Sequence, residues 1–414
     1  MTSRTGRPRW WVAGPSLLVA LVALAVWRVG SDEPYRADLS PRTAAPTARA
    51  GAAASVTQEL VRALAAGDAD AAADLAPAGD DRARALLGAV AHNARDLRLT
   101  DLSARYVDEV GAVSSDGSWT AALDLTWALD GFDQQPARAE VLAHFAPDGQ
   151  GVAVTDLGGG DRISPTWLRG RLAVRRTPDV LVMAGGDQAS REARGYLQRV
   201  RRAIPVVRRV LPGWRPAVVV EVPASPLELD HALGVAEGTY TDIAAVTAAA
   251  DGDPRAGGPV RVFVNPVVTG RLRGAGAQVV ISHELTHVAT DATTAAPDPW
   301  LQEGFADYVA LRDVDLPVTT TAGRAIASVR RDGVPDGLPG PADFDTSATD
   351  LEAAYELAWL ACVEIAAEAG ERGLVRVYRA AAGGASTTQA LGTVGLTRAE
   401  VLRGWQESLS RLAS

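Results

Sequence analysis

The chain has 414 residues, 41 basic and 50 acidic side chains, five histidines and one cysteine, and its formal net charge is −9. Every basic residue is arginine, which excludes a Schiff-base lysine and a Walker A phosphate loop. The single Cys362 excludes an intramolecular disulfide, a cysteine-based zinc finger and an iron–sulfur cluster. The negative charge argues against an extended nucleic-acid surface, so we expect no nucleic-acid partner.

The N-terminal segment has the pattern of a membrane anchor. Three arginines precede an apolar run from Trp10 to Trp27, whose length is close to the minimum for crossing a bilayer. The positive flank predicts that residues 1–9 stay in the cytoplasm, that residues 10–28 form one transmembrane signal anchor and that the rest lies outside the cell membrane. A cleaved signal peptide, which would give a secreted protein, is the alternative. Residues 29–54 are rich in Pro, Ala, Thr and Arg and are expected to be a flexible linker.

Residues 55–167 have a pattern of helices followed by strands. Apolar residues recur at three- and four-residue steps from Val56, and four strand-like runs between residues 103 and 157 are separated by Gly, Asp and Pro. This order resembles an NTF2-like α+β domain, a type that mostly serves as a ligand-pocket or assembly scaffold. The lone histidines His92 and His144 are interpreted as ordinary surface or core residues.

An arginine-rich helical stretch follows in residues 190–214. Tyr196 and Val200 belong to its apolar face, and arginines make the other face. Two interpretations stay open: a surface for an anionic partner, or a solvated face over a core. The β-rich runs 216–223 and 260–268 predict strands that precede the next helix.

The residues with metal chemistry begin in the run VVISHELTHVATD. His283 and His287 lie four residues apart, on one face of a helix, where both imidazoles can bind the same zinc ion. Glu284 has the position of the catalytic base in the H-E-x-x-H arrangement of metalloproteases. In a chain with only five histidines, chance does not account for this arrangement.

A second helix is predicted after Asp298, an N-cap residue that Pro299 follows at the first helical position. Glu303 and Asp307 lie one turn apart on this helix. Glu303 is expected to be the third zinc ligand, with one position left for water. Asp307 is expected to accept the second ring N–H of a zinc histidine, and we favour His283 as its partner.

The runs HELTH and WLQEGFADY together resemble the gluzincin metallopeptidases, most closely the bacterial peptidase-MA-like group. The resemblance implies one zinc ion per chain, bound by His283, His287 and Glu303, with Glu284 as the general base. It covers residues 171–414, for which it implies a small β-sheet followed by a mostly helical lobe. The Gly-x-Met-Glu-Asn element by which related aminopeptidases hold a free amino terminus is absent, which argues against aminopeptidase activity.

Further candidates lie outside these two motifs. Tyr355 falls where related proteins place a tyrosine after the site, and it is a candidate catalytic donor to the developing oxyanion, with packing in a helix bundle as the alternative. Cys362 has apolar neighbours and is expected to be an inert core thiol. His231 and Tyr240 are donors upstream, but nothing in their spacing connects them to the metal.

We therefore expect an α+β protein with an N-terminal transmembrane helix, an NTF2-like domain and a gluzincin-like peptidase domain. The predicted activity is the hydrolysis of a peptide or protein substrate by a zinc-activated water, with Glu284 as the base. Two alternatives stay open: a metal-binding interaction module without activity, and a zinc hydrolase of a non-peptide bond. No oligomeric state is predicted.

Overall fold

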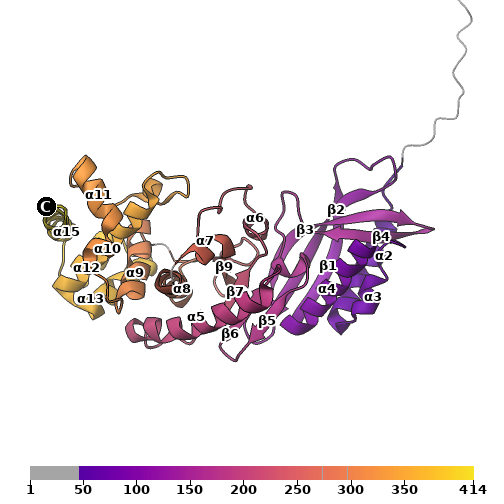
Figure 1. Ribbon diagram of the computed structural model, residues 1–414, viewed down its shortest axis with the longest axis horizontal. Helices are drawn as coiled ribbons and strands as arrows, with labels where there is room; N and C mark the ends of the chain where they lie inside the picture. Colours follow the sequence, from indigo (N-terminus) through magenta and orange to yellow (C-terminus); the bar gives the residue numbers. More distant parts are fainter. Residues whose placement is uncertain (1–45, 273, 296) are drawn as a thin grey trace, which may run out of the picture. The chain divides into compact units, whose positions relative to one another are not determined.

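The computed structural model describes residues 46–272, 274–295 and 297–414. Residues 46–414 form one compact unit that contains two β-sheets. A four-stranded sheet and its helices come first in the chain, a five-stranded sheet follows, and the C-terminal part is helical (Figure 1).

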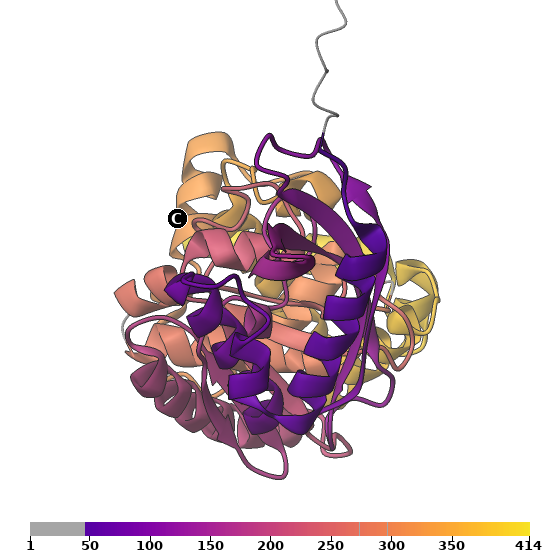
Figure 2. The same cartoon turned by 90° about the vertical axis from the view of Figure 1, so that its right-hand side faces the viewer.

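The first part begins with three helices, α2 (Ala50–Ala66), α3 (Ala69–Ala73) and α4 (Asp81–Leu97). Asp68 and Asp80 begin α3 and α4, because the carboxylate of each accepts a hydrogen bond from a backbone N–H in the first turn. The strands β1 (Leu99–Val110), β2 (Trp119–Leu129), β3 (Ala137–Asp148) and β4 (Gly151–Leu157) pair antiparallel in sequence order. The helices pack against this sheet, as Figures 1 and 2 show.

The second sheet is mixed, with strand order β5-β6-β7-β9-β8. Its strands are β5 (Ala173–Arg176), β6 (Val180–Ala184), β7 (Val218–Val222), β8 (Ala245–Ala249) and β9 (Val260–Val264). The three inner strands are parallel and almost entirely buried, whereas β5 and β8 pair antiparallel at the two edges. The crossover between β6 and β7 is α5 (Ala189–Val210), as parallel pairing requires. α6 (Pro226–Leu233) follows β7, and the edge strand β8 is left with one free side.

The helical part starts with α7 (Pro266–Arg271), α8 (Gly274–Ala289) and α9 (Pro299–Leu311). It continues with α10 (Val318–Thr321), α11 (Gly323–Asp332), α12 (Leu351–Ala369), α13 (Glu371–Ala382), α14 (Thr387–Gly392) and α15 (Arg398–Ala413), and short 3-10 helices lie at Thr166–Leu168 and Pro341–Phe344. One core joins the face of the second sheet that carries Val182 and Val220 to helices α5, α8, α9 and α12. This core seats the two helices that carry the histidines and carboxylates.

The other face of the second sheet packs against the first part of the chain. Leu181, Met183 and Val219 belong to the same core as β1–β4 and their helices. A buried ion pair joins the two sheets at this junction, because both terminal nitrogens of Arg261 on β9 donate to Asp133 at 2.7 Å. The first part therefore covers a sheet face that would otherwise be exposed to water.

The predicted fold class is wrong on one point. The described helices do not include one that is long and apolar enough to cross a membrane, and the structure is a mixed α/β arrangement. The longest described helices, α5 and α12, carry arginines or glutamates on exposed positions, as helices on a protein surface do. The segment 10–28, on which the anchor was predicted, lies outside the described residues, as does the tail 1–9. The predicted location of the chain is therefore not tested.

The prediction of a linker up to residue 54 is wrong for its last five residues. α2 begins at Ala50 instead of residue 55, and Ala53 is already fully buried. Alanine has the highest helix propensity, so the alanine-rich end of the predicted linker joins the helix. The predicted boundary near Trp167 falls in a buried 3-10 turn, and the division into two domains there stays a prediction.

Candidate metal centre

Helix α8 carries His283, Glu284 and His287 into the protein. Ile281 and Leu285 are fully buried in the core and fix which side of the helix faces inward. All three candidate site residues are nearly buried as well, with 6–9 % of each exposed. Polar side chains at such depth need partners, so the contacts they make are informative.

Helix α9 supplies the facing carboxylates. Asp298 and Pro299 start this helix, and Glu303 and Asp307 lie one turn apart on the side that faces α8. Gly304 allows the close approach of α9 to α12, because a Cβ atom there would come within 2.3 Å of the carbonyl oxygen of Ala358. The glycine after Glu303 is thus required by helix packing.

The three predicted ligands converge on one point. The Nε2 atoms of His283 and His287 lie 2.9 Å apart, and Glu303 Oε2 lies 3.1 Å from the first and 3.2 Å from the second. Three donor atoms tetrahedrally arranged around zinc at 2.0–2.1 Å would be about 3.3 Å from one another. In the described part of the chain, these residues form the one group with this kind of convergence. Their donor atoms therefore fit a metal ion such as zinc.

Asp307 sets the proton position on His283. Its Oδ1 atom lies 2.7 Å from His283 Nδ1, on the ring edge opposite to the cluster. In the neutral ring, this contact keeps the proton on Nδ1 and leaves the Nε2 lone pair facing His287 and Glu303. The arrangement is the one in which a histidine acts as a metal ligand.

The electrostatics of the cluster favour a cation at its centre. Burial lowers the pKa of His283, but Asp307 and Glu303 outweigh it and raise that pKa well above its usual value. Burial likewise raises the pKa of the Glu303 carboxyl, but the two histidines outweigh it and lower that pKa. Positive charge is thus stabilised where the donor atoms meet. A metal ion would supply that charge without a proton.

The other nitrogen of His287 differs from that of His283. His287 Nδ1 is buried and has no hydrogen-bond partner among the described residues. A hollow of about 390 Å³ reaches this histidine and is also lined by Trp214 and Asp291. The Nδ1 proton of His287 is therefore not fixed by a protein group, in contrast to that of His283.

Glu284 lies between the cluster and the edge of the second sheet. Its Oε2 accepts a hydrogen bond of 2.7 Å from Thr247 Oγ1 on β8, and its backbone carbonyl accepts a second, of 3.2 Å, from the same hydroxyl. Thr247 was not singled out in the sequence. The two partners are 37 positions apart in the chain, and no local pattern connects them.

Tyr355 lies beside the cluster on α12. Its ring centroid is 6.0 Å from that of His283, and Phe344 packs edge-on against its other side at 5.5 Å. Burial, together with the charges of Glu303 and Glu284, raises the pKa of Tyr355 far above its usual value, so its hydroxyl keeps its proton. The structure thus places a hydrogen-bond donor next to the site.

Tyr240 also lies near these groups. Burial and the carboxylates of Asp230 and Glu284 raise its pKa. The loop that carries Tyr240 is fixed by buried side chains, since its N–H donates to Asp230 at 2.9 Å and Asn265 donates to its carbonyl at 3.0 Å. Sequence spacing gave no connection between Tyr240 and the candidate ligands, because folding of the sheet brings them together.

The remaining chemical candidates lie elsewhere. His92 contacts the carbonyl of Gly88 in α4, and His144 on β3 contacts Thr120 on the neighbouring strand β2. His231 on α6 lies 3.7 Å from Glu237. Cys362 is fully buried, and burial raises its pKa far above the usual value, as for a core thiol.

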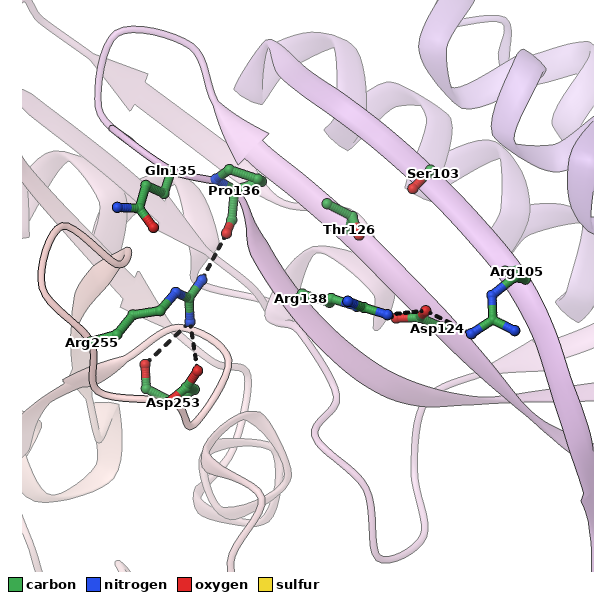
Figure 3. Close-up of a pocket in the computed structure, with 9 residues that line it drawn as sticks. All are labelled: Ser103, Arg105, Asp124, Thr126, Gln135, Pro136, Arg138, Asp253 and Arg255. Atoms are coloured by element: carbon green, nitrogen blue, oxygen red, sulfur yellow. Dashed lines mark hydrogen bonds and ion pairs between the residues drawn. The ribbon is translucent and has the colours of Figure 1, made fainter.

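A hollow of about 660 Å³ lies away from the candidate ligands, between the first sheet and the loop that follows β8 (Figure 3). Arg138 donates two hydrogen bonds to Asp124 and, with Arg105, lowers the pKa of this carboxyl to about 2. Arg255 donates to Asp253 and to the carbonyl of Pro136 (Figure 3). The acidic groups of this hollow are each paired with an arginine.

Comparison with known proteins adds nothing to these observations. No family model matches the chain, and neither a curated protein nor a solved structure matches it.

Proposed function

We propose that this protein is a zinc-dependent hydrolase of peptide bonds, with His283, His287 and Glu303 as the ligands of one zinc ion per chain. The observation that carries the proposal is the convergence of their three donor atoms, 2.9–3.2 Å apart, with Glu284 next to His283 in the chain and outside the converging group. Asp307 supports it, because it holds His283 in the form that a metal needs. Zinc, when bound, lowers the pKa of water toward about 7 and polarises a carbonyl group.

Glu284 is the general base of the proposed reaction. It follows His283 directly and is not one of the converging ligands. Its carboxylate takes a proton from the attacking water and delivers it to the nitrogen of the leaving amine. Thr247 holds the carboxylate at the edge of β8 by its hydrogen bond of 2.7 Å. Tyr355 keeps its proton and donates a hydrogen bond to the oxyanion that develops on the substrate carbonyl.

The neighbourhood of the site favours an extended polypeptide as the substrate. β8 is an edge strand, so its free side can pair with the backbone of a bound peptide. The same strand carries Thr247, the partner of Glu284, which places such a peptide next to the base. This edge is the feature that favours a peptidase over a hydrolase of small non-peptide substrates.

Digestion of a peptide library by the purified full chain, read by mass spectrometry, tests the proposal. Cleavage should occur with zinc, stop on chelation and return when zinc is added. Glu284→Gln should slow cleavage at least about 100-fold, the usual contribution of a general base. Glu352→Gln, which changes an exposed glutamate on α12, is the matched control and should cleave like the wild type.

Two outcomes would favour the alternatives. Zinc binding without cleavage of any peptide would favour a metal-binding interaction module. Hydrolysis of an ester but not of any peptide, again lost in Glu284→Gln, would favour a hydrolase of a non-peptide bond.

A further inference from the structure

The exposed side of α5 consists mainly of arginine. The exposed residues of this helix are six arginines, Ser190, Gln198 and Pro205, so none of them is acidic or aromatic. The six are Arg191, Arg194, Arg201, Arg202, Arg208 and Arg209. We call this the α5 arginine face. It is unusual in a chain whose formal net charge is −9.

The spacing of these arginines places them on one side of the helix. At about 100° per residue they fall within an arc of about 120°, and at about 1.5 Å per residue they extend over about 27 Å. Tyr196, Val200 and Val207 lie on the opposite side and are buried in the core. In Figure 1, α5 lies below α8.

Most of this positive charge is not neutralised by neighbours. Arg209 pairs with Asp313 at 2.5 Å, and Arg191 lies 3.8 Å from Glu192. The other four arginines of the face make no ion pair with any residue that the structure describes. Four guanidinium groups are thus available to anions outside the protein.

We propose that the α5 arginine face binds the anionic headgroups of a phospholipid membrane. Charge complementarity supports this partner, because a guanidinium group binds a phosphate through two parallel hydrogen bonds. The arrangement supports it as well: the arginines follow one helix over about 27 Å, so a plane of headgroups can contact several of them at once. Single-stranded nucleic acid is disfavoured, since the face has no aromatic residue on which a base can stack.

Vesicle binding of the full chain tests this proposal. The readout is the ratio of its partition coefficients on two kinds of vesicle, phosphatidylcholine alone and phosphatidylcholine with 30 % phosphatidylglycerol. Any contribution of residues 1–45 that does not depend on lipid charge cancels in this ratio. The wild type should prefer the anionic vesicles, and the preference should fall as salt is raised, because salt screens the charges.

A triple variant, Arg194→Gln, Arg201→Gln and Arg208→Gln, should lower this preference about 100-fold at low salt, at roughly fivefold for each arginine. The matched control is Arg398→Gln, Arg403→Gln and Arg411→Gln, which changes net charge equally through exposed residues of α15. The control should stay within about twofold of the wild type. Glutamine preserves helix propensity, so both variants should keep the circular dichroism of the wild type.

Three results would overturn the proposal. The first is equal binding of the wild type to both vesicles. The second is an equal loss of the preference in the two triple variants, which would show an effect of net charge alone. The third is tighter binding to duplex DNA or to polyglutamate than to the vesicles, through the same three arginines, which would make another macromolecule the partner.

Discussion

The contact between Asp307 and His283 leads to a quantitative prediction about zinc affinity. The two side chains meet at 2.7 Å and are 17 % and 11 % exposed, so water screens their interaction little. A hydrogen bond to a charged group contributes about 1.5–3 kcal/mol, which corresponds to about 10- to 150-fold in a dissociation constant. Asp307→Asn keeps an acceptor but removes the charge, and Asp307→Ala removes both. We therefore expect about 10-fold weaker zinc binding in the first variant and about 100-fold in the second.

Competition with a zinc-chelating dye measures these affinities. Asp313→Asn is the matched control, since this carboxylate lies just after α9 and pairs with surface arginines instead of a candidate ligand. The control should bind zinc like the wild type. Equal affinity in the wild type and both Asp307 variants would refute the reasoning, because Asp307 would then not orient His283.

Three further predictions concern stability. Asp133→Ala leaves Arg261, whose side chain is 2 % exposed, without its bidentate partner. It should lower the free energy of unfolding, measured with urea, by about 3–5 kcal/mol. A loss below about 1 kcal/mol would contradict the contribution of the buried pair. Gly304→Ala introduces a Cβ atom 2.3 Å from the carbonyl oxygen of Ala358. The substitution should destabilise the fold by about 1–3 kcal/mol and weaken zinc binding, because it moves the candidate ligand Glu303. Stability and zinc affinity equal to those of the wild type would show that α9 and α12 separate freely. Burial raises the pKa of Glu356 in the folded protein to about 7, from its usual 4.5. The folded protein therefore holds this proton more tightly than the unfolded chain does. The resulting contribution to stability is present below about pH 4.5 and is lost as the pH rises to about 7. Glu356→Gln should remove this loss and gain about 1–2 kcal/mol relative to the wild type between pH 4 and pH 8, after allowance for its partial exposure; parallel pH profiles would count against it.

The local patterns of the sequence locate the elements that carry the candidate site. The four-residue spacing of His283 and His287 and the Asp298–Pro299 start signal each belong to a helix that the structure contains. The β-rich runs 216–223 and 260–268 contain β7 and β9. Such signals are local, so a single sequence is sufficient to find them.

Long-range features were not accessible in the same way. β8 is short and alanine-rich, so its sequence does not have the pattern of a strand, and the contact of Thr247 with Glu284 could not be predicted. The position of Tyr240 depends on Asp230 and Asn265, which lie 10 and 25 residues away in the chain. The packing of the second sheet against the first part of the chain depends on both cores at once. These relationships result from tertiary packing, which local propensity does not encode.

The zinc content of purified protein tests the central claim most directly. Elemental analysis should find one zinc ion per chain in the wild type and in Glu284→Gln, because the proposal makes Glu284 the base and not a ligand. His287→Ala and Glu303→Ala should each lose most of the metal, since each removes one of three converging donor atoms. A wild type without metal, or full zinc content in Glu303→Ala, would contradict the account.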